Sequence, residues 1–392
     1  IAWAASSSEA WPLWNGGGLW GITLFLGAIS AWLAYRNRAA MGAYVRQNYR
    51  LLLTIEGLTA ALYVIMLLVR LSNPDIWTSG FGGEKPMDFA YFNGVLRSTV
   101  FPPVDPWFTG GYINYYYYGY VVVGVPTLML GVVPAIAYNL ILPTIFAAAG
   151  IAAFSAAYTL VDFWREHSTA EHRRPKVSRL GNPMIAGIAA LMMAVLLGNL
   201  DTPRVLLKGL ARMGGYDDQI TLQRFLQDEY ALTNNGLPPS SEQAIEIVER
   251  ATDPNLSDSL RYELHIAADQ WRSVFNGLTQ WASGQPLPIG ADRWFWAPSR
   301  VIAESVGGLA ITEMPFFTFV YGDLHAHMIT MPMTLFAICF VVNEVLLAGR
   351  EKRRWAWRLI SVILAGGLVG LLRAANTWDY PTFLVLGVVG LG

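Results

Sequence analysis

Long apolar runs alternate with polar and basic stretches along most of the chain. The runs that approach the roughly 20 residues a helix needs to cross a bilayer are Leu19 to Tyr35, Leu51 to Leu71, Tyr138 to Val161, Met184 to Leu200, Met328 to Leu347 and Trp357 to Leu372. A further run begins at Tyr380 and reaches the end of the sequence. The pattern predicts an all-α fold, a polytopic bundle of transmembrane helices.

Basic residues predict the orientation of this bundle, because loops rich in Lys and Arg stay on the cytoplasmic side. They gather in three stretches, Arg36 to Arg50, Arg165 to Arg179 and Arg350 to Arg358. All three fall on one side only if the apolar stretch Tyr116 to Val133, which Gly and Pro interrupt, does not cross fully. We therefore expect that stretch to be re-entrant or interfacial.

Composition agrees with a membrane protein. The chain is 54% hydrophobic and 14% charged, whereas soluble domains carry about 25% charged residues. A net charge of -1 gives no reason to expect a nucleic-acid partner. Cys339 is the one cysteine, so no internal disulfide is possible. Because the chain opens at Ile1 and stops inside an apolar run, we expect it to be a piece of a longer protein.

The predicted organisation follows from these spans. Two transmembrane helices occupy 1–71, an outer loop with the Tyr-rich segment 72–137, further transmembrane helices 138–200, an outer helical cap 201–327, and the last transmembrane helices 328–392. Within the cap, helical patterning is strongest at Arg204 to Met213, Ile220 to Tyr230, Ser241 to Arg250 and Leu260 to Trp281, between Pro-rich breaks.

The outer loop contains an unusual aromatic phrase, Phe101 to Tyr120, with four consecutive tyrosines. Tyr and Trp favour the membrane surface because each has an apolar ring and a polar tip. The same segment also contains acidic and amide side chains. The candidate substrate-binding residues here are Asp105, Asn114, Tyr115 and Tyr116. An ordinary interfacial belt is the alternative for the tyrosines.

This phrase resembles the signature of the "YYY" family of polytopic membrane proteins. Other stretches that fit the same resemblance are Gly83 to Asp88, Gly198 to Asp201, Ser299 to Ile302, Thr312 to Phe317, Gly322 to His327 and Ala375 to Pro381. More distantly, the layout is similar to that of the GT-C class of glycosyltransferases, which use polyprenyl-phosphate sugar donors. That second likeness is an analogy of architecture.

The GT-C resemblance implies a catalytic carboxylate in the first large outer loop. A carboxylate just above the membrane can act as general base toward an acceptor hydroxyl. Asp88 is the candidate base, with Glu84 as a second candidate or a metal ligand. The alternatives are a solvated loop charge, or Asp88 as the N-cap of a helix that starts at Phe89.

Two further groups carry candidate chemistry. Asp323, His325 and His327 precede the Met328 run and could bind a divalent metal such as Mg²⁺ or Mn²⁺ through Asp323 and one histidine. The alternative there is an Asp N-cap followed by two interfacial histidines.

The second group follows the Trp357 run. The guanidinium of Arg373 suits a lipid-linked phosphate, and Asn376, Trp378 and Asp379 offer hydrogen bonds and a sugar-stacking ring. Its alternative is an Arg373 side chain that snorkels to the headgroups, with Trp378 in an aromatic belt.

Three functions remain open on this basis. The first is a glycosyltransferase that acts on a polyprenyl-phosphate sugar at the outer face of the cell membrane, with membrane lipids around it. The second is a non-catalytic subunit or scaffold of a membrane protein complex, and the third is a transporter. The chain has no phosphate-cradling Gly-Lys-Ser/Thr loop and no paired-cysteine metal site, which argues against ATP-driven transport.

Overall fold

The computed structural model describes residues 13–77, 83–170, 181–198, 200–217, 240, 242–243, 245–246, 257–290, 297–299, 312, 314–348 and 355–391. Within these ranges the chain is mainly α-helical, and the one β feature is an isolated antiparallel bridge between Val104 and Tyr112. The chain forms two compact units, one of residues 1–198 with 315–392 and one of residues 199–314.

The first unit is a bundle of long apolar helices. Five described helices are long and apolar enough to cross a membrane: α1 (Gly16–Arg36), α2 (Arg38–Ser72), α5 (Pro134–Ala170), α13 (Ala326–Ala348) and α14 (Trp355–Ala375). They confirm the predicted all-α, polytopic architecture. The predicted span Met184 to Leu200 forms an α-helix, α6 (Pro183–Leu191), continued by a π-helix, η3 (Met192–Leu197). This segment is a sixth candidate span if it is counted together with the helix that follows it.

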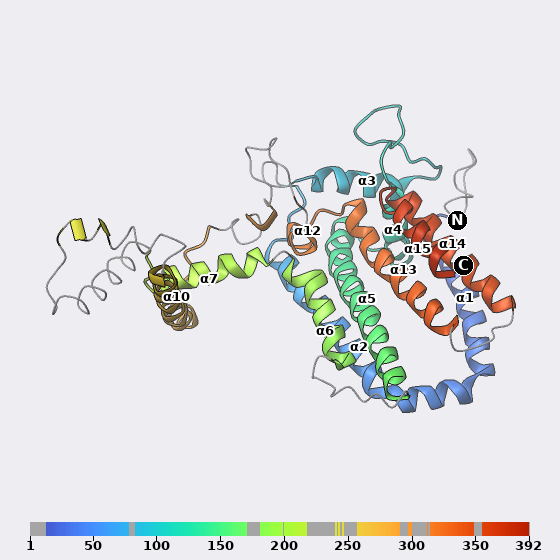
Figure 1. The fold of residues 1–392 in the computed structure, drawn as a ribbon. Coiled ribbons are helices and arrows are strands. Elements are labelled where there is room, and N and C mark those ends of the chain that lie inside the picture. Colours follow the sequence, from blue (N-terminus) through green and yellow to red (C-terminus); the bar gives the residue numbers. More distant parts are fainter. Residues whose placement is uncertain are drawn as a thin grey trace. The chain divides into compact units, whose positions relative to one another are not determined.

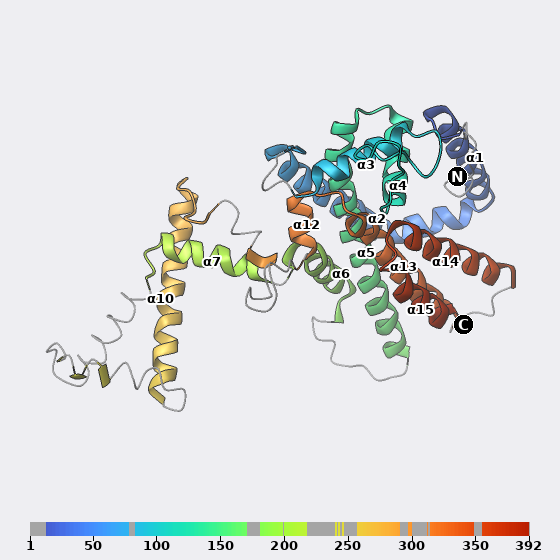
Figure 2. The ribbon, with the colours of Figure 1, turned by 90° about the horizontal axis from the view of Figure 1, so that it is seen from above.

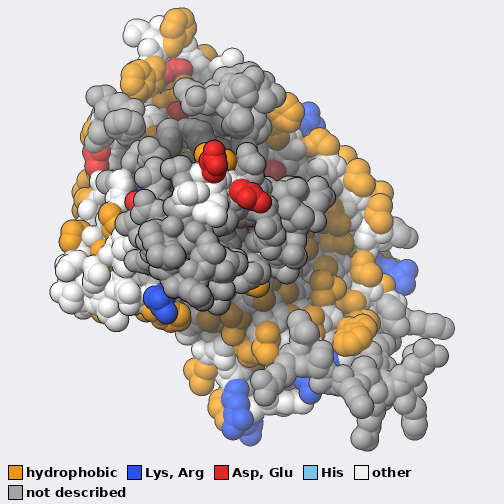
Figure 3. Space-filling model, turned by 60° about the vertical axis from the view of Figure 1, so that its left-hand side comes forward, with side chains coloured by type: hydrophobic (Ala, Val, Ile, Leu, Met, Phe, Trp, Pro, Cys, Tyr) orange, Lys and Arg blue, Asp and Glu red, His pale blue; other side chains and the backbone are white. Residues whose placement is uncertain are grey.

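Helix α5 is the centre of this bundle and lies between α6 and α13 in both ribbon views (Figures 1 and 2). Its side chains Tyr138, Leu142 and Phe154 are fully buried. By contrast, α1 and α14 expose most of their leucine, isoleucine and aromatic side chains, and hydrophobic side chains are exposed over much of the described surface in Figure 3. That distribution fits a bundle whose outer surface faces lipid.

The Tyr-rich stretch contains a short apolar helix. This helix is α4 (Tyr118–Leu130), which has 13 residues and ends at Gly131 in the left-handed conformation. At 1.5 Å per residue such a helix is about 20 Å long, too short for a hydrocarbon core of about 30 Å. Helix α4 therefore does not cross a bilayer as one straight span.

The first basic stretch was predicted as a loop, and that prediction is wrong. Only Asn37 separates α1 from α2, and α2 continues through Arg46 and Arg50 for 35 residues. A helix of that length is about 50 Å long and outreaches the hydrocarbon core, so its first turns can carry arginines outside the lipid. Hydropathy marks where the apolar part begins, and it does not mark where the helix begins.

The described parts of the first two basic stretches lie at one end of the bundle, where α13 also ends. A cavity of about 430 Å³ is lined there by Tyr44 and Asn48 at the start of α2, Tyr158 and Asp162 late in α5, and Asn343 late in α13. Residues 171–180 and 349–354, which hold most of the other basic residues, lie outside the described ranges.

The second unit contains α7 (Asp201–Met213), α10 (Ser257–Ala282) and the short 3-10 helix η4 (Ala297–Ser299). Helices α7 and α10 pack closely at Gly214 and Gly277, where any Cβ would overlap the backbone of the other helix. Two predicted helices, Ile220 to Tyr230 and Ser241 to Arg250, lie wholly or largely outside the described residues. The unit ends at Met314, so Pro315 to His327, expected in the cap, belong to the bundle unit.

Candidate active site

Acidic and imidazole side chains meet at the end of the bundle where α2 ends and where α3 (Lys85–Arg97), α5 and α13 begin (Figure 1). One side is the first turn of α3, with Glu84 at its N-cap and Asp88 inside the turn. The other side is the loop between α12 (Pro315–Tyr321) and α13, which carries Asp323 and His325. We call Glu84, Asp88, Asp323 and His325 the Asp88 cluster.

Asp88 is the most enclosed member of the cluster, with no exposed surface. The hydroxyl of Tyr120 on α4 donates a hydrogen bond of 2.6 Å to Asp88 Oδ1, and His325 Nδ1 lies 3.7 Å from the same oxygen. The other oxygen, Oδ2, is buried and has no hydrogen-bond partner in the described part of the chain. Because α3 starts at Lys85, the alternative role of Asp88 as the cap of a helix from Phe89 is wrong.

His325 joins the two sides of the cluster. Its Nε2 lies 3.5 Å from Glu84 Oε2 and 3.6 Å from Asp323 Oδ2. The backbone N–H of Glu84 donates to Asp323 Oδ2 at 3.2 Å. Asp323 and His325 are buried, whereas the Glu84 side chain is 57% exposed. Glu84 is therefore the member of the cluster whose carboxylate reaches the protein surface.

Burial and charge shift both central groups. Burial raises the pKa of the Asp88 carboxyl to about 7, although the charge of His325 and the hydrogen bond from Tyr120 lower it. Burial also lowers the pKa of His325, but its interaction with Asp323 and the charges of Asp88 and Glu84 outweigh that effect and raise the pKa to about 9. At neutral pH the site thus holds an imidazolium beside a carboxyl group that is close to half protonated.

The loop that carries Asp323 and His325 is held by buried neighbours. Tyr138 at the start of α5 donates its hydroxyl to Gly322 O at 3.2 Å and accepts from Leu324 N at 2.9 Å. Gly322 has φ +79, and a Cβ there would lie 2.5 Å from Arg70 Nη1. Arg70 is fixed by hydrogen bonds of 3.0 and 2.7 Å to Asn139 Oδ1. These contacts restrict the conformation of the loop that carries Asp323 and His325.

The sequence did not single out Arg70, Tyr120, Tyr138 or Lys85. An arginine inside an otherwise apolar run was a usable signal, because such residues are expensive in a membrane. Lys85 is buried with its ammonium 5.0 Å from the Tyr321 ring centre, and burial lowers its pKa against the charge of Asp323. No sequence signal distinguishes Tyr120 from the tyrosines beside it.

The predicted aromatic binding residues lie around the cluster with different contacts. Tyr115 packs on Tyr91 and on Tyr116, at ring-centre distances of 5.8 and 5.4 Å. Burial raises the pKa of Tyr115 to about 12, helped by the charges of Asp88 and Glu84, which places it beside the cluster. Asp105 accepts a hydrogen bond of 2.8 Å from Trp107 N and so stabilises a turn; Asn114 is exposed.

The third predicted group forms a separate turn between α14 and α15 (Tyr380–Leu391). Asp379 Oδ2 accepts hydrogen bonds from Asn376 Nδ2 at 3.0 Å and from Thr330 Oγ1 at 2.9 Å. Arg373 is exposed over the Tyr380 ring, and Trp378 is 83% exposed. Among the described residues no hydrogen bond or ion pair joins this turn to the Asp88 cluster. The exposure of Arg373 and Trp378 agrees with the alternative of snorkelling and an aromatic belt.

The described side chains of Asp323, His325 and His327 are not arranged as ligands of one metal ion. His325 itself occupies the space between Glu84 and Asp323, and the ring of His327 stacks on that of His325 at 5.4 Å. Within the described ranges no group of three His, Cys, Asp or Glu side chains is arranged to hold a metal ion. Divalent-metal binding by Asp323, His325 and His327 therefore stays a prediction, and no chemistry below depends on it.

Fold and site together define a class: a multi-pass helical membrane protein with a buried acidic and imidazole cluster at one end of its bundle. The chain belongs to the family described as "Uncharacterized membrane protein (DUF2298)", which it matches over residues 1–392. This match confirms a membrane protein family over the whole chain. No curated protein matches the chain, and no solved structure does.

Proposed function

We propose that the Asp88 cluster is the catalytic centre of a membrane glycosyltransferase that takes its sugar from a polyprenyl-phosphate donor. Two things support this proposal. The sequence resembles GT-C enzymes in layout, with a carboxylate in the first large polar loop. The same carboxylate, Asp88, lies in a buried cluster with Asp323 and His325, which come from a segment far along the chain.

The observation that carries the proposal is the state of the Asp88 carboxyl group. A general base works best when its pKa lies near the working pH, and burial brings the pKa of Asp88 to about 7. One of its oxygens is held by Tyr120, while the other is buried without a partner among the described residues. Such an unsatisfied oxygen is costly in a fold, and an acceptor hydroxyl would satisfy it.

The proposed reaction moves one proton and exchanges one bond. Asp88 accepts the proton of the acceptor hydroxyl, and the acceptor oxygen forms a bond to the anomeric carbon of the sugar. The bond from that carbon to the phosphate oxygen breaks, and its electron pair leaves with the polyprenyl phosphate. His325, whose pKa of about 9 keeps it protonated at neutral pH, is the cation placed to stabilise negative charge beside Asp88.

The proposed reaction takes place at the outer face of the cell membrane. The cluster lies where α5 and α13 begin, and the described arginines of the first two basic stretches lie at the opposite ends of α2 and α5. Because basic ends stay in the cytoplasm, this arrangement favours an outward-facing cluster. Polyprenyl-phosphate sugars, which are membrane lipids, would reach it from the bilayer.

The test is Asp88→Asn in membranes supplied with radiolabelled polyprenyl-phosphate sugar. We expect transfer to fall on the order of 10² to 10⁴-fold, with the protein still folded. Asp162→Asn is the control, because this carboxylate borders the cavity at the opposite end of α5, and it should keep near-normal transfer. Full transfer by Asp88→Asn would refute the proposal, and so would an equal loss in both variants.

A further inference from the structure

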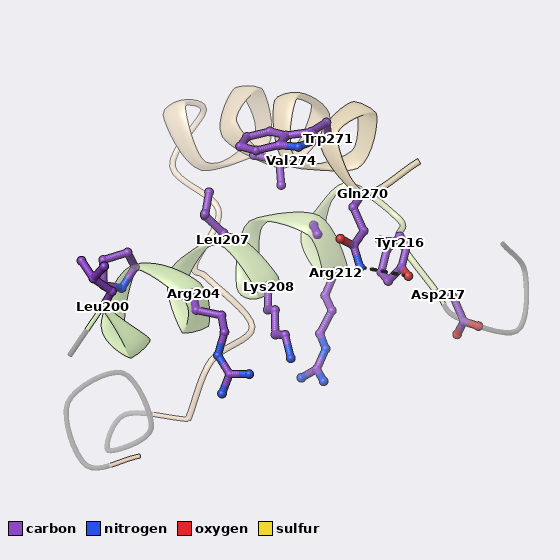
Figure 4. Close-up of a pocket in the computed structure, with 12 residues that line it drawn as sticks. Leu200, Arg204, Leu207, Lys208, Arg212, Tyr216, Asp217, Gln270, Trp271 and Val274 are labelled. Atoms are coloured by element: carbon purple, nitrogen blue, oxygen red, sulfur yellow. Dashed lines mark hydrogen bonds between the residues drawn. The ribbon is translucent and has the colours of Figure 1, made fainter. Parts of the chain in front are cut away.

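The second unit contains a groove that the Asp88 cluster does not use. It lies between α7 and α10 and has a volume of about 870 Å³, within the range of small-molecule pockets. Arg204, Lys208 and Arg212 border it on the α7 side. Their four-residue spacing places them on one face of the helix, and Figure 4 shows all three side chains pointing the same way, away from α10.

The rest of the groove is apolar and aromatic. Leu207 points from α7 toward α10 (Figure 4), and Val274 and Trp271 border the groove on the α10 side. Trp271 is 55% exposed and Leu207 40% exposed. At one end the amide of Gln270 donates a hydrogen bond of 3.2 Å to the Tyr216 hydroxyl. The groove thus combines an apolar wall with a cationic rim.

Two of the three cations are available to a ligand. Arg204 pairs with the carboxylate of Asp201 one turn earlier. Lys208 and Arg212 are exposed, and neither forms an ion pair or side-chain hydrogen bond with any residue in the described ranges. Asp217 at the far end is the one acidic side chain among the described residues that border the groove. The free positive charge therefore lies beside the apolar wall.

We propose that this groove binds one anionic membrane lipid, with its phosphate at Lys208 and Arg212 and its hydrocarbon along Leu207 and Trp271. Cations attract the phosphates of anionic lipids, and a tryptophan ring with an apolar face and a polar N–H suits the boundary between headgroup and chain. In the sequence, only three residues separate the end of the apolar helix η3 from the start of α7. The inference is independent of the proposed transferase reaction.

Photo-crosslinking of the full chain in phosphatidylcholine nanodiscs tests this inference. A small fraction of phosphatidylglycerol or phosphatidylcholine would carry a photoactivatable group in one acyl chain, and mass spectrometry would locate the adducts. We expect the phosphatidylglycerol probe to label α7 and α10 near Leu207 and Trp271, and the phosphatidylcholine probe to label them far less. Competition with unlabelled phosphatidylglycerol then gives the affinity.

Paired variants separate charge from shape. Lys208→Gln with Arg212→Gln should raise the competing lipid fraction needed for half-displacement by roughly fivefold per removed charge. Lys208→Arg with Arg212→Lys keeps both charges and should behave like the unchanged chain. Both pairs are exposed, so helical content and thermal unfolding should not change, and a variant that unfolds would be replaced by Arg212→Gln alone.

Several results would overturn the inference. Equal labelling by both lipids, or labelling that ignores the charge-removing pair, would indicate only non-specific contact with a bilayer. Loss of labelling in millimolar inorganic phosphate would assign the cations to a soluble phosphate. Crosslinks between two copies of the chain through this groove would assign it to an oligomer contact.

Discussion

The Asp88 cluster and the Asp379 turn are built from similar parts and differ in how their carboxylates are satisfied. In both, an aspartate lies beside the end of apolar helices and accepts a hydrogen bond from a neutral side chain. Asp379 Oδ2 accepts two such bonds, from Asn376 and Thr330. Asp88 accepts one, from Tyr120, faces an imidazole, and buries its second oxygen without a partner among the described residues.

Under the proposed function, this is the difference between a structural carboxylate and a reactive one. Neutral donors stabilise a carboxylate without requiring a proton, so the Asp379 turn ties α14 and α15 to α13 and needs no further partner. At Asp88, burial works against the charge and raises the pKa to about 7. A group in that state is found at functional sites more often than in a structural turn.

The largest expected effect is a loss of stability with rising pH. The Asp88 pKa rises from 3.8 to about 7 on folding, so the folded chain holds the proton more tightly and stability falls between about pH 4 and 7. The His325 pKa rises from 6.5 to about 9, so its contribution is full below 6.5 and is lost as pH rises through 9. The midpoint of thermal unfolding in detergent should therefore fall steadily from pH 5 to 9.

Two variants test which groups cause this fall of the unfolding midpoint with pH. Asp88→Asn should flatten it, because it removes one titrating group and one of the charges that raise the pKa of His325. Asp379→Asn should leave the slope intact, because among the described residues no hydrogen bond or ion pair joins Asp379 to Asp88 or His325. An identical slope in all three proteins would show that the cluster does not titrate as described.

Next in size is the effect of His325→Gln on transfer. At wild type, a base with a pKa of about 7 and an imidazolium with a pKa of about 9 give an activity that rises near pH 7 and falls near pH 9. Removing the cation should cost about 10²-fold in rate. It should also shift the acid limb of the pH profile, where activity rises, to higher pH, because the His325 charge lowers the pKa of Asp88.

The contrasting variant is Asn376→Ala in the Asp379 turn. Both limbs of its pH profile should stay where they are at wild type. If Asn376→Ala moved the acid limb as far as His325→Gln did, the two regions would be one coupled site, and the distinction between them would be lost.

The sequence predicted the spans and part of the site for identifiable reasons. Apolar length alone predicts α5, α13 and α14, because a bilayer fixes how long an apolar helix must be. Charges next to such runs drew attention to Asp88, Asp323 and His325 and equally to Arg373 and Asp379. The pattern could not rank these residues, because the difference between them lies in their partners, which come from other helices.

Other features were beyond the sequence for physical reasons. Which tyrosine reaches Asp88 depends on where α4 begins and on which face it packs, and Tyr120 is two residues past the four-tyrosine run. That α2 extends through its basic part depends on helix propensity in water, which hydropathy does not measure. The π-helix that follows α6 likewise has no marker in an apolar run.

A smaller effect concerns the loop that positions Asp323 and His325. Gly322→Ala forces a Cβ within 2.5 Å of Arg70 Nη1 at a φ of +79, whereas Gly110 has a similar φ of +84 and open space around it. Each substitution carries the backbone cost of about 1 kcal/mol. We expect Gly322→Ala to lose about 2 kcal/mol more than Gly110→Ala, measured as the difference in denaturant unfolding. Equal losses would mean that Arg70 moves aside freely.

The smallest effect should come from Thr330→Val, which removes a donor to Asp379 and keeps the side-chain shape. Thr330 is fully buried, and its hydroxyl lies 2.9 Å from Asp379 Oδ2. Because Asn376 still donates to the same oxygen, the loss should be about 1 kcal/mol of unfolding free energy, with transfer activity and both limbs of its pH profile unchanged. Tyr120→Phe removes the corresponding donor at Asp88, and there the acid limb should shift upward because that hydrogen bond lowers the pKa of Asp88. A shifted limb in Thr330→Val, or none in Tyr120→Phe, would reverse the roles assigned to the two carboxylates.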